Sequence, residues 1–403
     1  MDSVDSYLAE VLAAISPLPS RELALADALS AVLDGDVTAE WPLPAFENSA
    51  MDGYAVRAAD IAGASAGKPI TLPVHGEIPA GDTTAHTVEP GTCIRIMTGA
   101  LMPAGADAVV PVESTDGGTE IVAIREAAEP GSSVREIGGD AQPGDLLLPS
   151  GTQLGAAHLG VLAAAGRGTV QARPRPRVTV ISTGNELVEP GTQLIPGQIW
   201  ESNATMLTAA ARQAGCPARR HPIVRDDPDA VLAAVQDALA GADLLITSGG
   251  VSMGGEHDVV KAALGTLGTV TFRKVAMQPG MPQGFGVVGQ DRTPIFTLPG
   301  NPVSAYVSFR LFVVPALDAL QGHNAWERGL PRPARLTTPV RSPAEKRSFL
   351  RGVLDRPAGE VTPVTGQASH QLASLARANA LVIVPEQVTS LEAGATVDVM
   401  ELP

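Results

Sequence analysis

Between residues 173 and 330, short β-rich runs alternate with helical patterns, and this alternation limits the possible folds more than any other feature of the chain. Ser202 can cap one of the helices, and Asp227 with Pro228 can cap and open another. Strands and helices that alternate at these lengths favour a mostly parallel sheet joined by right-handed crossovers. The expected strands are 178–182, 243–247, 270–275 and 295–298, and the expected helices are 202–214, 227–239, 258–264 and one that Asn301 and Pro302 begin.

The segments on either side of this alternation have different patterns. Apolar residues at helical spacing predict a helix over 3–15, which Pro17 ends, and a second short helix over 21–33. Short β-rich runs fill 46–137, and similar runs return after Pro331. We therefore expect a multi-domain α/β plus β fold that contains a three-layer α/β domain. The predicted domains are an elongated N-terminal helical or mixed domain (1–45 and 139–172), an inserted β domain (46–138), the α/β domain (173–330) and a small β-barrel-like domain (331–403).

Composition narrows the classes of partner. The formal net charge of -15 argues against a nucleic-acid partner, so an anionic substrate needs a local basic pocket or a divalent metal. Cys93 and Cys216 lie outside any CxxC spacing, and the histidines show no metal-binding spacing, so we expect neither a disulfide nor a zinc site. No basic-then-apolar leader opens the chain, and the apolar stretches 159–165 and 311–320 are too short to span a bilayer. We expect a soluble, cytoplasmic protein with no membrane partner.

The loop after the strand 243–247 combines hydroxyls with glycines. In an open α/β sheet, ligands bind beyond the carboxyl ends of the strands, where helix N-termini favour negative charge. Ser248, Gly249, Gly250 and Ser252 would allow close backbone approach and donate hydrogen bonds to a phosphate. An ordinary glycine turn between a strand and a helix could have the same residues, and the nearby carboxylate of Asp258 favours a binding site over that alternative.

A second loop, ISTGNEL at 181–187, supplies Thr183 and Glu186 at the end of another strand. A carboxylate in this position is most often a helix cap or a solvated side chain, yet Glu186 and Asp258 would lie on the same rim of the sheet. Two carboxylates there could hold Mg²⁺, which takes oxygen ligands, keeps several waters and bridges phosphates. We therefore expect a magnesium site formed by Glu186 and Asp258.

Cationic side chains that could serve an oxyanion lie farther along the chain. Lys274 precedes the turn 278–282, and Ser348 and Arg351 belong to the C-terminal domain. A solvated strand face is the usual place for lysine and arginine. An acidic protein that holds an oxyanion nevertheless needs several convergent cations or hydroxyls, and this need favours a role in binding.

A polar turn in the first half of the chain, within PAFENSAMDGYAV (44–56), places Ser49 and Asp52 between strand-like runs. Together with six later segments, it resembles the molybdopterin molybdotransferase family, MoeA in bacteria and the E domain of gephyrin in animals. The resemblance runs from about residue 5 to the C-terminus. The later segments are CIRIMTGALMPAGADAVVPVE (93–113), SSVREIGGD (132–140), ISTGNELVEPG (181–191), ITSGGVSMGGEHDVVK (246–261), MQPGMPQGFG (277–286) and TLPGNPVSAY (297–306).

Two positions depart from the family pattern. Met281 replaces the lysine of the usual PGKP turn, which removes one cation expected near the substrate. Gly255 lengthens the approach to Asp258 by one residue against the commoner family spacing. Both departures concern groups that the resemblance places at the substrate.

The resemblance implies that adenylylated molybdopterin is hydrolysed at its pyrophosphate, that molybdate is inserted into the dithiolene, and that AMP is released. It also implies a homodimer with a shared cleft, to which the first half of one chain contributes Ser49, Asp52, Thr98, Arg135 and Asp140. The implied catalytic residues are Asp52, Asp140, Glu186, Asp258 and Lys274, and the implied substrate-binding residues are Ser49, Thr98, Arg135, Thr183, Ser248, Gly249, Gly250, Ser252, Pro299, Ser348 and Arg351.

Two other functions remain open at this point. An adenylyltransferase of the same pathway uses a related α/β domain with its own glycine-rich loop, and it is also a possible partner. A non-catalytic scaffold is the second alternative, because the gephyrin E domain also clusters receptors. PAFENSAMDGYAV and the C-terminal β domain argue against the adenylyltransferase, and nothing in the sequence identifies a scaffold partner.

Overall fold

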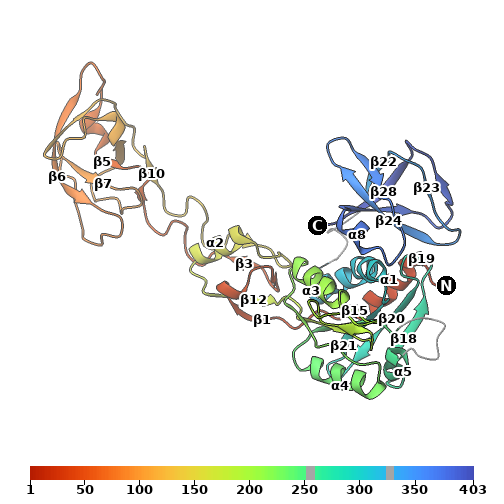
Figure 1. The fold of residues 1–403 in the computed structure, drawn as a ribbon. Coiled ribbons are helices and arrows are strands. Elements are labelled where there is room, and N and C mark those ends of the chain that lie inside the picture. The colour runs from red at the N-terminus through yellow and green to blue at the C-terminus, as the bar shows by residue number, and fades with distance from the viewer. Residues whose placement is uncertain (251–258, 324–330) are drawn as a thin grey trace. The chain divides into compact units, whose positions relative to one another are not determined.

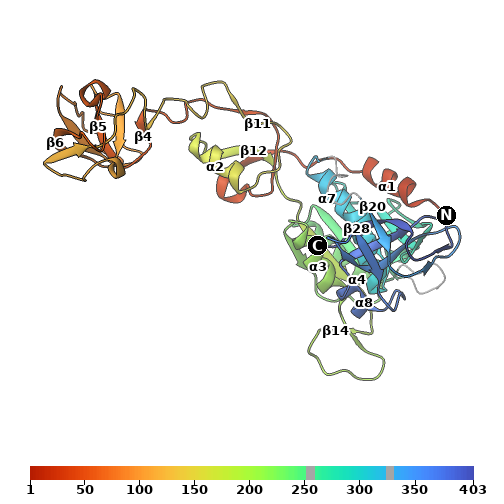
Figure 2. The ribbon, with the colours of Figure 1, turned by 90° about the horizontal axis from the view of Figure 1, so that it is seen from above.

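The computed structural model describes residues 1–250, 259–323 and 331–403, which form two compact units. Unit 1 comprises Met1–Leu23, Ser30–Asp34 and the described part of Gln171–Pro403, and unit 2 comprises Ala24–Leu29 and Gly35–Val170 (Figures 1 and 2). Ser252, Gly255 and Asp258 lie outside the described residues, so their predicted roles stay predictions. The four predicted domain boundaries also stay predictions.

Unit 1 contains a six-stranded sheet in the order β16-β13-β17-β21-β20-β18. The first four strands are parallel to one another, whereas β20 runs antiparallel to both β21 and β18. The predicted mostly parallel sheet is therefore confirmed. The sequence did not predict the antiparallel strand β20, because glycines interrupt its apolar pattern. The strands are β13 (Val178–Ser182), β16 (Ala218–Arg220), β17 (Leu244–Ser248), β18 (Val270–Lys274), β20 (Pro282–Val288) and β21 (Thr293–Leu298).

Helices cover both faces of this sheet, which confirms the three-layer arrangement (Figure 1). Strand side chains alternate between the faces, so Val180 and Ile246 pack against one helical layer while Ile181 and Leu245 pack against the other. The first layer contains α1 (Val4–Ala13), α3 (Asn203–Gln213), α6 (Pro302–Ser308) and α7 (Val314–Leu320), and the second contains α4 (Pro228–Leu239) and α5 (Val259–Gly265). Alternation on β13 and β17 thus accounts for two apolar cores.

A single helical run from Pro302 to Leu320 joins α6 to α7 through a π-helical turn, Phe309–Val313. Pro315 removes the N–H that would bond to Leu311, and the helix widens before it. The run is 19 residues long with a mean hydropathy of 1.5, enough by length and composition to cross a membrane. It is longer than the apolar stretch 311–320 predicted from the sequence. Its window is 72% buried, as in the core helix of a globular domain.

The predicted helix over 21–33 is wrong. This segment forms β1 (Arg21–Ala24), a 3-10 turn (Leu25–Asp27) and β2 (Val32–Leu33). Strand β2 pairs antiparallel with β12 (Thr169–Arg173), so a strand from far along the chain overrides the helix propensity of the alanines and leucines. The first predicted helix is confirmed as α1, where the Ser3 hydroxyl accepts the Ser6 N–H at 3.1 Å.

The C-terminal strands close into the predicted barrel. Strand β24 pairs with both β25 and β26, and the order β24-β25-β22-β28-β26 returns to β24. Strand β19 (Met277–Gln278) adds to the outside of β24, next to the α/β sheet. The barrel strands are β22 (Arg332–Leu336), β24 (Arg347–Asp355), β25 (Glu360–Pro363), β26 (Ala380–Val384) and β28 (Thr396–Glu401), with α8 (Leu372–Ala376) before β26 and the short pair β23 (Val340–Arg341) and β27 (Ser390–Leu391).

Unit 2 contains the inserted β module, a five-stranded sheet in the order β8-β5-β7-β6-β9. In the sequence, β4 (Asn48–Ser49) precedes this sheet and β10 (Val134–Arg135) follows it, and the two short strands pair with each other. Helix α2 (Ala156–Ala164) comes after β10 and β11. The predicted multi-domain α/β plus β fold is confirmed. The remaining strands of unit 2 are β3 (Val37–Thr38), β5 (Gly53–Val56), β6 (Ile70–Ile78), β7 (Cys93–Ile96), β8 (Ala108–Pro111), β9 (Ile121–Ile124) and β11 (Leu146–Leu148).

Candidate functional site

A cleft of about 560 Å³ opens at the carboxyl ends of β13 and β17 in unit 1. Four predicted site residues line it, from two neighbouring loops: Thr183 and Glu186 after β13, and Ser248 and Gly249 at the end of β17. The first residues of α3 and the start of α6 form further parts of the wall. The remaining lining residues are Ser182, Leu187, Leu194, Ile199, Trp200, Glu201, Ser202, Asn203, Gly300, Asn301, Pro302, His370 and Leu372.

The loop after β17 needs glycine for two different reasons. Gly249 and Gly250 have φ values of 102° and 64°, which side-chain-bearing residues rarely adopt. A Cβ at Gly249 would lie 2.8 Å from the backbone oxygen of Thr183, and one at Gly250 would lie 2.7 Å from Cγ2 of Val260. Gly249 therefore lets this loop lie directly against the loop after β13, and Gly250 lets it lie against α5.

Asn203, the first residue of α3, ties three parts of the cleft together. Its Nδ2 donates to Oγ of Ser248 at 2.8 Å and to the carbonyl of Gly300 at 2.7 Å. The Ser248 hydroxyl in turn donates to the carbonyl of Pro299 at 3.5 Å. Sequence reasoning had missed Asn203, because it singled out only the helix start at Ser202.

Two buried polar atoms in the cleft make no hydrogen bond to any other described residue: Oγ1 of Thr183 and Oδ1 of Asn203. A buried polar group without a partner costs roughly 1–3 kcal/mol. Such groups in a native protein call for an explanation, and a ligand or ordered water is the usual one. The hydroxyl and the amide oxygen thus supply a donor and an acceptor for a polar ligand.

Glu201, which sequence reasoning also missed, organises the side of the cleft next to α3. Ser202 is the N-cap by position, but its side chain makes no cap bond, so the predicted serine cap is wrong. The carboxylate of Glu201 takes that role and accepts from the N–H of Ala204 at 2.5 Å and of Thr205 at 3.3 Å. It also accepts from Oγ of Ser182 at 2.9 Å. A carboxylate replaces the serine because it reaches the amides and neutralises the positive helix end.

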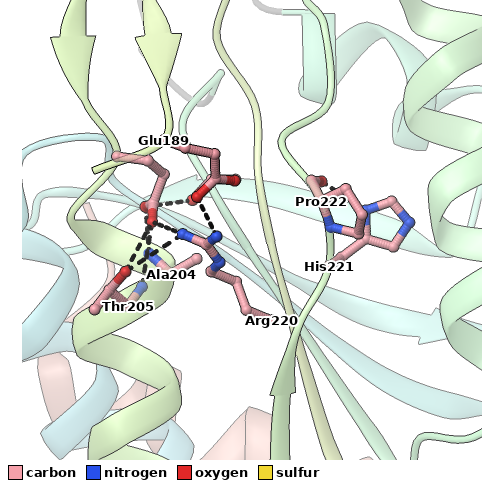
Figure 3. Close-up of polar contacts among 8 residues, drawn as sticks. Glu189, Ala204, Thr205, Arg220, His221 and Pro222 are labelled. Atoms are coloured by element: carbon pink, nitrogen blue, oxygen red, sulfur yellow. Dashed lines mark hydrogen bonds and ion pairs between the residues drawn. The ribbon is translucent and has the colours of Figure 1, made fainter. Parts of the chain in front are cut away.

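Arg220 supplies the positive charge that balances this buried carboxylate (Figure 3). Its Nη1 donates to Glu201 at 3.3 Å, and its Nη2 pairs with Glu189. The bond to Glu189 raises the pKa of Arg220 above its ordinary value, with a smaller contribution from Glu201. Glu189 directly follows β14 (Leu187–Val188), and Arg220 is the last residue of the edge strand β16. Their ion pair therefore holds β14 against β16.

Glu186 is the one predicted magnesium ligand within the described residues, and it is exposed on the cleft wall. Its carboxylate makes no hydrogen bond or ion pair with another residue of the described ranges. Within those ranges, no three His, Cys, Asp or Glu side chains are grouped so that they could hold a metal ion together. A single carboxylate still suits Mg²⁺, which commonly binds through one or two carboxylates, substrate phosphates and water.

The structure does not bring Ser348, Arg351 and Lys274 into this cleft. Ser348 lines a second hollow of about 330 Å³ beside β24 of the barrel, together with Gln278 and Pro279, and its Oγ accepts from Ser342 at 2.8 Å. Lys274 is exposed at the end of β18 and lines neither hollow.

Arg351 is fully buried beneath the segment that precedes α8. Its Nη2 donates to the carbonyls of Gly366 at 2.7 Å and Ala368 at 3.2 Å. Its Nε and Nη1 have no partner among the described residues, and burial lowers the pKa of the guanidinium. In this structure Arg351 positions the segment that ends at His370, a residue of the cleft wall.

In unit 2, the predicted residues Asp52 and Thr98 form one contact. Oδ1 of Asp52 accepts from the backbone N–H of Thr98 at 2.7 Å and from its hydroxyl at 2.8 Å. These bonds, the backbone one first, lower the pKa of Asp52. The turn thus keeps an exposed carboxylate charged.

The other predicted residues of unit 2 lie on neighbouring segments. Ser49 is buried in β4, where its hydroxyl donates to the carbonyl of Met51 at 2.5 Å. Arg135, on the paired strand β10, donates to Oδ1 of Asn48 at 3.5 Å. Asp140 is exposed, and its N–H bonds to the carbonyl of Leu43 at 2.8 Å. Their part in a shared cleft stays a prediction.

The fold and the cleft together define a class: multi-domain α/β proteins that bind a polar ligand at the carboxyl edge of a parallel sheet, here with a β module and a C-terminal barrel attached. Three family models match the chain: "MoeA N-terminal region (domain I and II)" over residues 2–166, "Probable molybdopterin binding domain" over 179–319 and "MoeA C-terminal region (domain IV)" over 333–402. The chain belongs to the MoeA family.

Individual relatives agree with this assignment along the whole chain. "Molybdopterin molybdenumtransferase 2" of Mycobacterium tuberculosis is 48% identical and covers 98% of this chain and 97% of its own length. "Molybdopterin molybdenumtransferase" of Bacillus subtilis is 37% identical, covering 94% of this chain and 89% of its own length. Among solved structures, two MoeA proteins of Pyrococcus horikoshii have TM-scores of 0.77 and 0.75 at 32% and 26% identity. The first covers 99% of this chain and 98% of its own, and the second covers both chains fully (100%).

Proposed function

We propose that this chain acts in molybdenum cofactor biosynthesis as a molybdopterin molybdenumtransferase, which inserts molybdate into adenylylated molybdopterin and releases AMP. The observation that carries the proposal is the cleft at the carboxyl ends of β13 and β17, where Thr183, Glu186, Ser248 and Gly249 converge. These groups match an anionic, phosphate-bearing substrate, and relatives of matching length bear the transferase name.

Binding of the substrate phosphate would rest on hydroxyls and on the glycine loop. The unpaired Oγ1 of Thr183 can donate to a phosphate oxygen, and Gly249 keeps the backbone close enough for contact. The unpaired Oδ1 of Asn203 can accept from a hydroxyl or an amino group of the same molecule. No lysine or arginine lines the described part of this cleft, so neutral donors carry the orientation.

Magnesium dependence is part of the proposal. Glu186, together with Asp258 outside the described residues, would hold Mg²⁺, and the ion would neutralise the pyrophosphate and position the attacking water. Glu186 contributes an exposed carboxylate with no described partner to satisfy, so it can turn toward an ion without breaking a bond. Positioning and electrostatic stabilisation would account for most of the rate enhancement.

Molybdate would bind at the hollow that Ser348 lines, with Arg351 as a second candidate, whereas Lys274 lines neither hollow and would have to approach from the exposed end of β18. Ser348 lines the hollow beside β24, and two guanidinium nitrogens of the buried Arg351, Nε and Nη1, have no described partner. Met281, where the family has lysine, removes one cation from this set. We therefore expect weaker oxyanion binding than in a lysine-bearing relative, and Met281→Lys should strengthen it.

The proposal also includes a cytoplasmic homodimer in which Asp52 of one chain serves the cleft of the other. Support comes from Asp52 itself, whose exposed carboxylate is held charged by Thr98 in a turn of unit 2. Asp52→Ala and Glu186→Ala variants, each inactive alone, should regain activity when mixed as a heterodimer. Failure of the mixed dimer to regain activity rules out the shared site.

The decisive experiment is incubation of the protein with adenylylated molybdopterin, Mg²⁺ and molybdate, followed by measurement of AMP. We expect molybdate-dependent AMP release that Thr183→Val reduces at least tenfold. Thr208→Val is the matched control, because it also removes an unpaired buried hydroxyl but one on α3 that does not line the cleft.

The same assay separates the other functions. Pyrophosphate release from ATP would indicate an adenylyltransferase, and absence of both products would leave a scaffold. A chain that releases AMP equally well without molybdate would contradict the proposed transfer.

A further inference from the structure

The segment 187–200, called the ribbon below, is held by Arg220 and carries an exposed aromatic side chain at the cleft. Strand β14 pairs parallel with β15 (Ile199–Trp200), and the loop 189–198 between them reaches away from the sheet (Figure 2). Nε1 of Trp200 donates to the carbonyl of Thr192 at 2.7 Å. This bond fixes one edge of the indole, while 50% of the residue stays exposed. The indole is therefore oriented without being covered.

Apolar and polar residues lie on different segments of the cleft lining. Leu187, Leu194, Ile199 and Trp200 come from the ribbon, whereas Ser182, Thr183, Asn203 and Ser248 come from the strand ends and α3. Binding sites for small molecules commonly combine apolar and aromatic walls with a few placed polar groups, in volumes of about 300–1,000 Å³. A phosphate needs only the polar part, so the ribbon must serve another part of the ligand.

The ribbon is held firmly enough to act as a wall. The N–H of Glu201 bonds to the carbonyl of Val188 at 2.9 Å, and Arg220 joins Glu189 to the buried carboxylate of Glu201 (Figure 3). A solvated loop would not need a buried ion pair at its base. The contacts thus fix the position of Trp200 relative to Ser182, which also bonds to Glu201.

We propose that Trp200 is a specificity-determining residue whose indole face stacks on a flat heteroaromatic ring of the substrate. The inference rests on the proposed function, which supplies two such rings, the adenine and the pterin of adenylylated molybdopterin. Stacking on an aromatic side chain contributes about 1–3 kcal/mol per base and needs only an accessible π face. The fixed, half-exposed indole of Trp200 meets that requirement.

The test uses the full-length chain and two ring probes, AMP and neopterin monophosphate, with ribose 5-phosphate as the ringless probe. Titration calorimetry should show that Trp200→Leu weakens at least one ring probe roughly tenfold, whereas Trp200→Phe changes it less than about threefold. The affinity of ribose 5-phosphate should not change. Ile195→Ala is the matched control, since this exposed ribbon residue does not line the cleft.

A second readout follows the indole directly. With Trp41 and Trp326 replaced by phenylalanine, the stacked probe should quench the fluorescence of Trp200. The probe that quenches identifies the ring, adenine or pterin. Equal affinities of wild type and Trp200→Leu for both ring probes overturn the inference even if AMP release occurs. Absence of binding by both ring probes also overturns it, whereas loss of AMP release alone counts against the proposed function only.

Discussion

Substitution of Glu201 by glutamine tests whether the buried carboxylate organises the cleft. Its Oε1 accepts from Ser182 and Ala204, and its Oε2 accepts from Thr205 and Arg220. The Ala204 N–H on the Oε1 side and the Arg220 guanidinium on the Oε2 side can only donate, so the amide NH₂ of glutamine must face a donor in either orientation. Breaking a buried ion pair from one side costs about 3–5 kcal/mol, and an unsatisfied buried donor costs roughly 1–3 kcal/mol. We expect Glu201→Gln to lower the free energy of unfolding of unit 1 by about 3–5 kcal/mol.

Urea unfolding followed by Trp200 fluorescence measures this loss, because Trp200 immediately precedes Glu201 and reports on unit 1. Trp41 and Trp326 are replaced by phenylalanine in every sample. Glu189→Gln is the matched control: it removes the other partner of Arg220, but its side chain is 49% exposed. Exposed ion pairs contribute about 0–1 kcal/mol, so the control should change stability by no more than that. A loss below about 1 kcal/mol for Glu201→Gln, or equal losses for both variants, refutes the reasoning.

Three further predictions concern single residues. Gly249→Ala forces a Cβ to within 2.8 Å of the Thr183 backbone oxygen, at a φ of 102°. It should therefore weaken AMP binding at least tenfold, as measured by calorimetry. Unchanged affinity would contradict the close approach of the two loops. The hydrogen bonds from Thr98 lower the pKa of Asp52 below its ordinary value of 3.8. They therefore stabilise the fold at pH values above 3.8, and this stabilisation is lost as the pH falls through the pKa of the folded state. An NMR titration of Asp52 should show a midpoint below 3.8, and Thr98→Ala should move that midpoint upward. Burial raises the pKa of Cys93 to about 12, so a thiol reagent at pH 8 should leave it unlabelled until the protein unfolds.

Local patterns predicted the central strands β13 and β17 of the α/β sheet because their burial is uniform. All residues of β13 and β17 are buried, and both strands appeared in the sequence as short apolar runs bounded by turn residues. Asp227 was predicted as a helix cap, and its side chain does accept the N–H of Ala230 at 2.9 Å. Local chemistry sufficed in these cases, since the partner lies within one turn or one face.

The same reasoning failed where a distant segment decides the structure. The alanine-rich segment 21–33 has helix propensity, but pairing of β2 with β12 makes part of it a strand. Strand β20 was hidden by its glycines, which the sheet requires: a Cβ at Gly284 would lie 1.9 Å from Oγ1 of Thr297, and one at Gly286 2.1 Å from a backbone oxygen.

For the site, the sequence identified the residue types at the strand ends but not the network that supports them. Thr183, Glu186, Ser248 and Gly249 were predicted from their loops, and they line one cleft. Glu201 was missed, since a glutamate before a helix is ordinarily solvated. No pattern in the sequence shows that Ser182 and Arg220, each 19 positions away, would surround it.

The sequence by itself determined the alternation of strands and helices, the glycine and hydroxyl loops that follow two strands, and the membership of the MoeA family. Those properties depend on side-chain periodicity and local sterics, which neighbouring residues specify. Only the tertiary structure decided that Glu201 is buried with Arg220 and that Trp200 faces the cleft. Both outcomes depend on which groups lose water together when distant segments pack, and desolvation is a property of the assembled fold rather than of any stretch of chain.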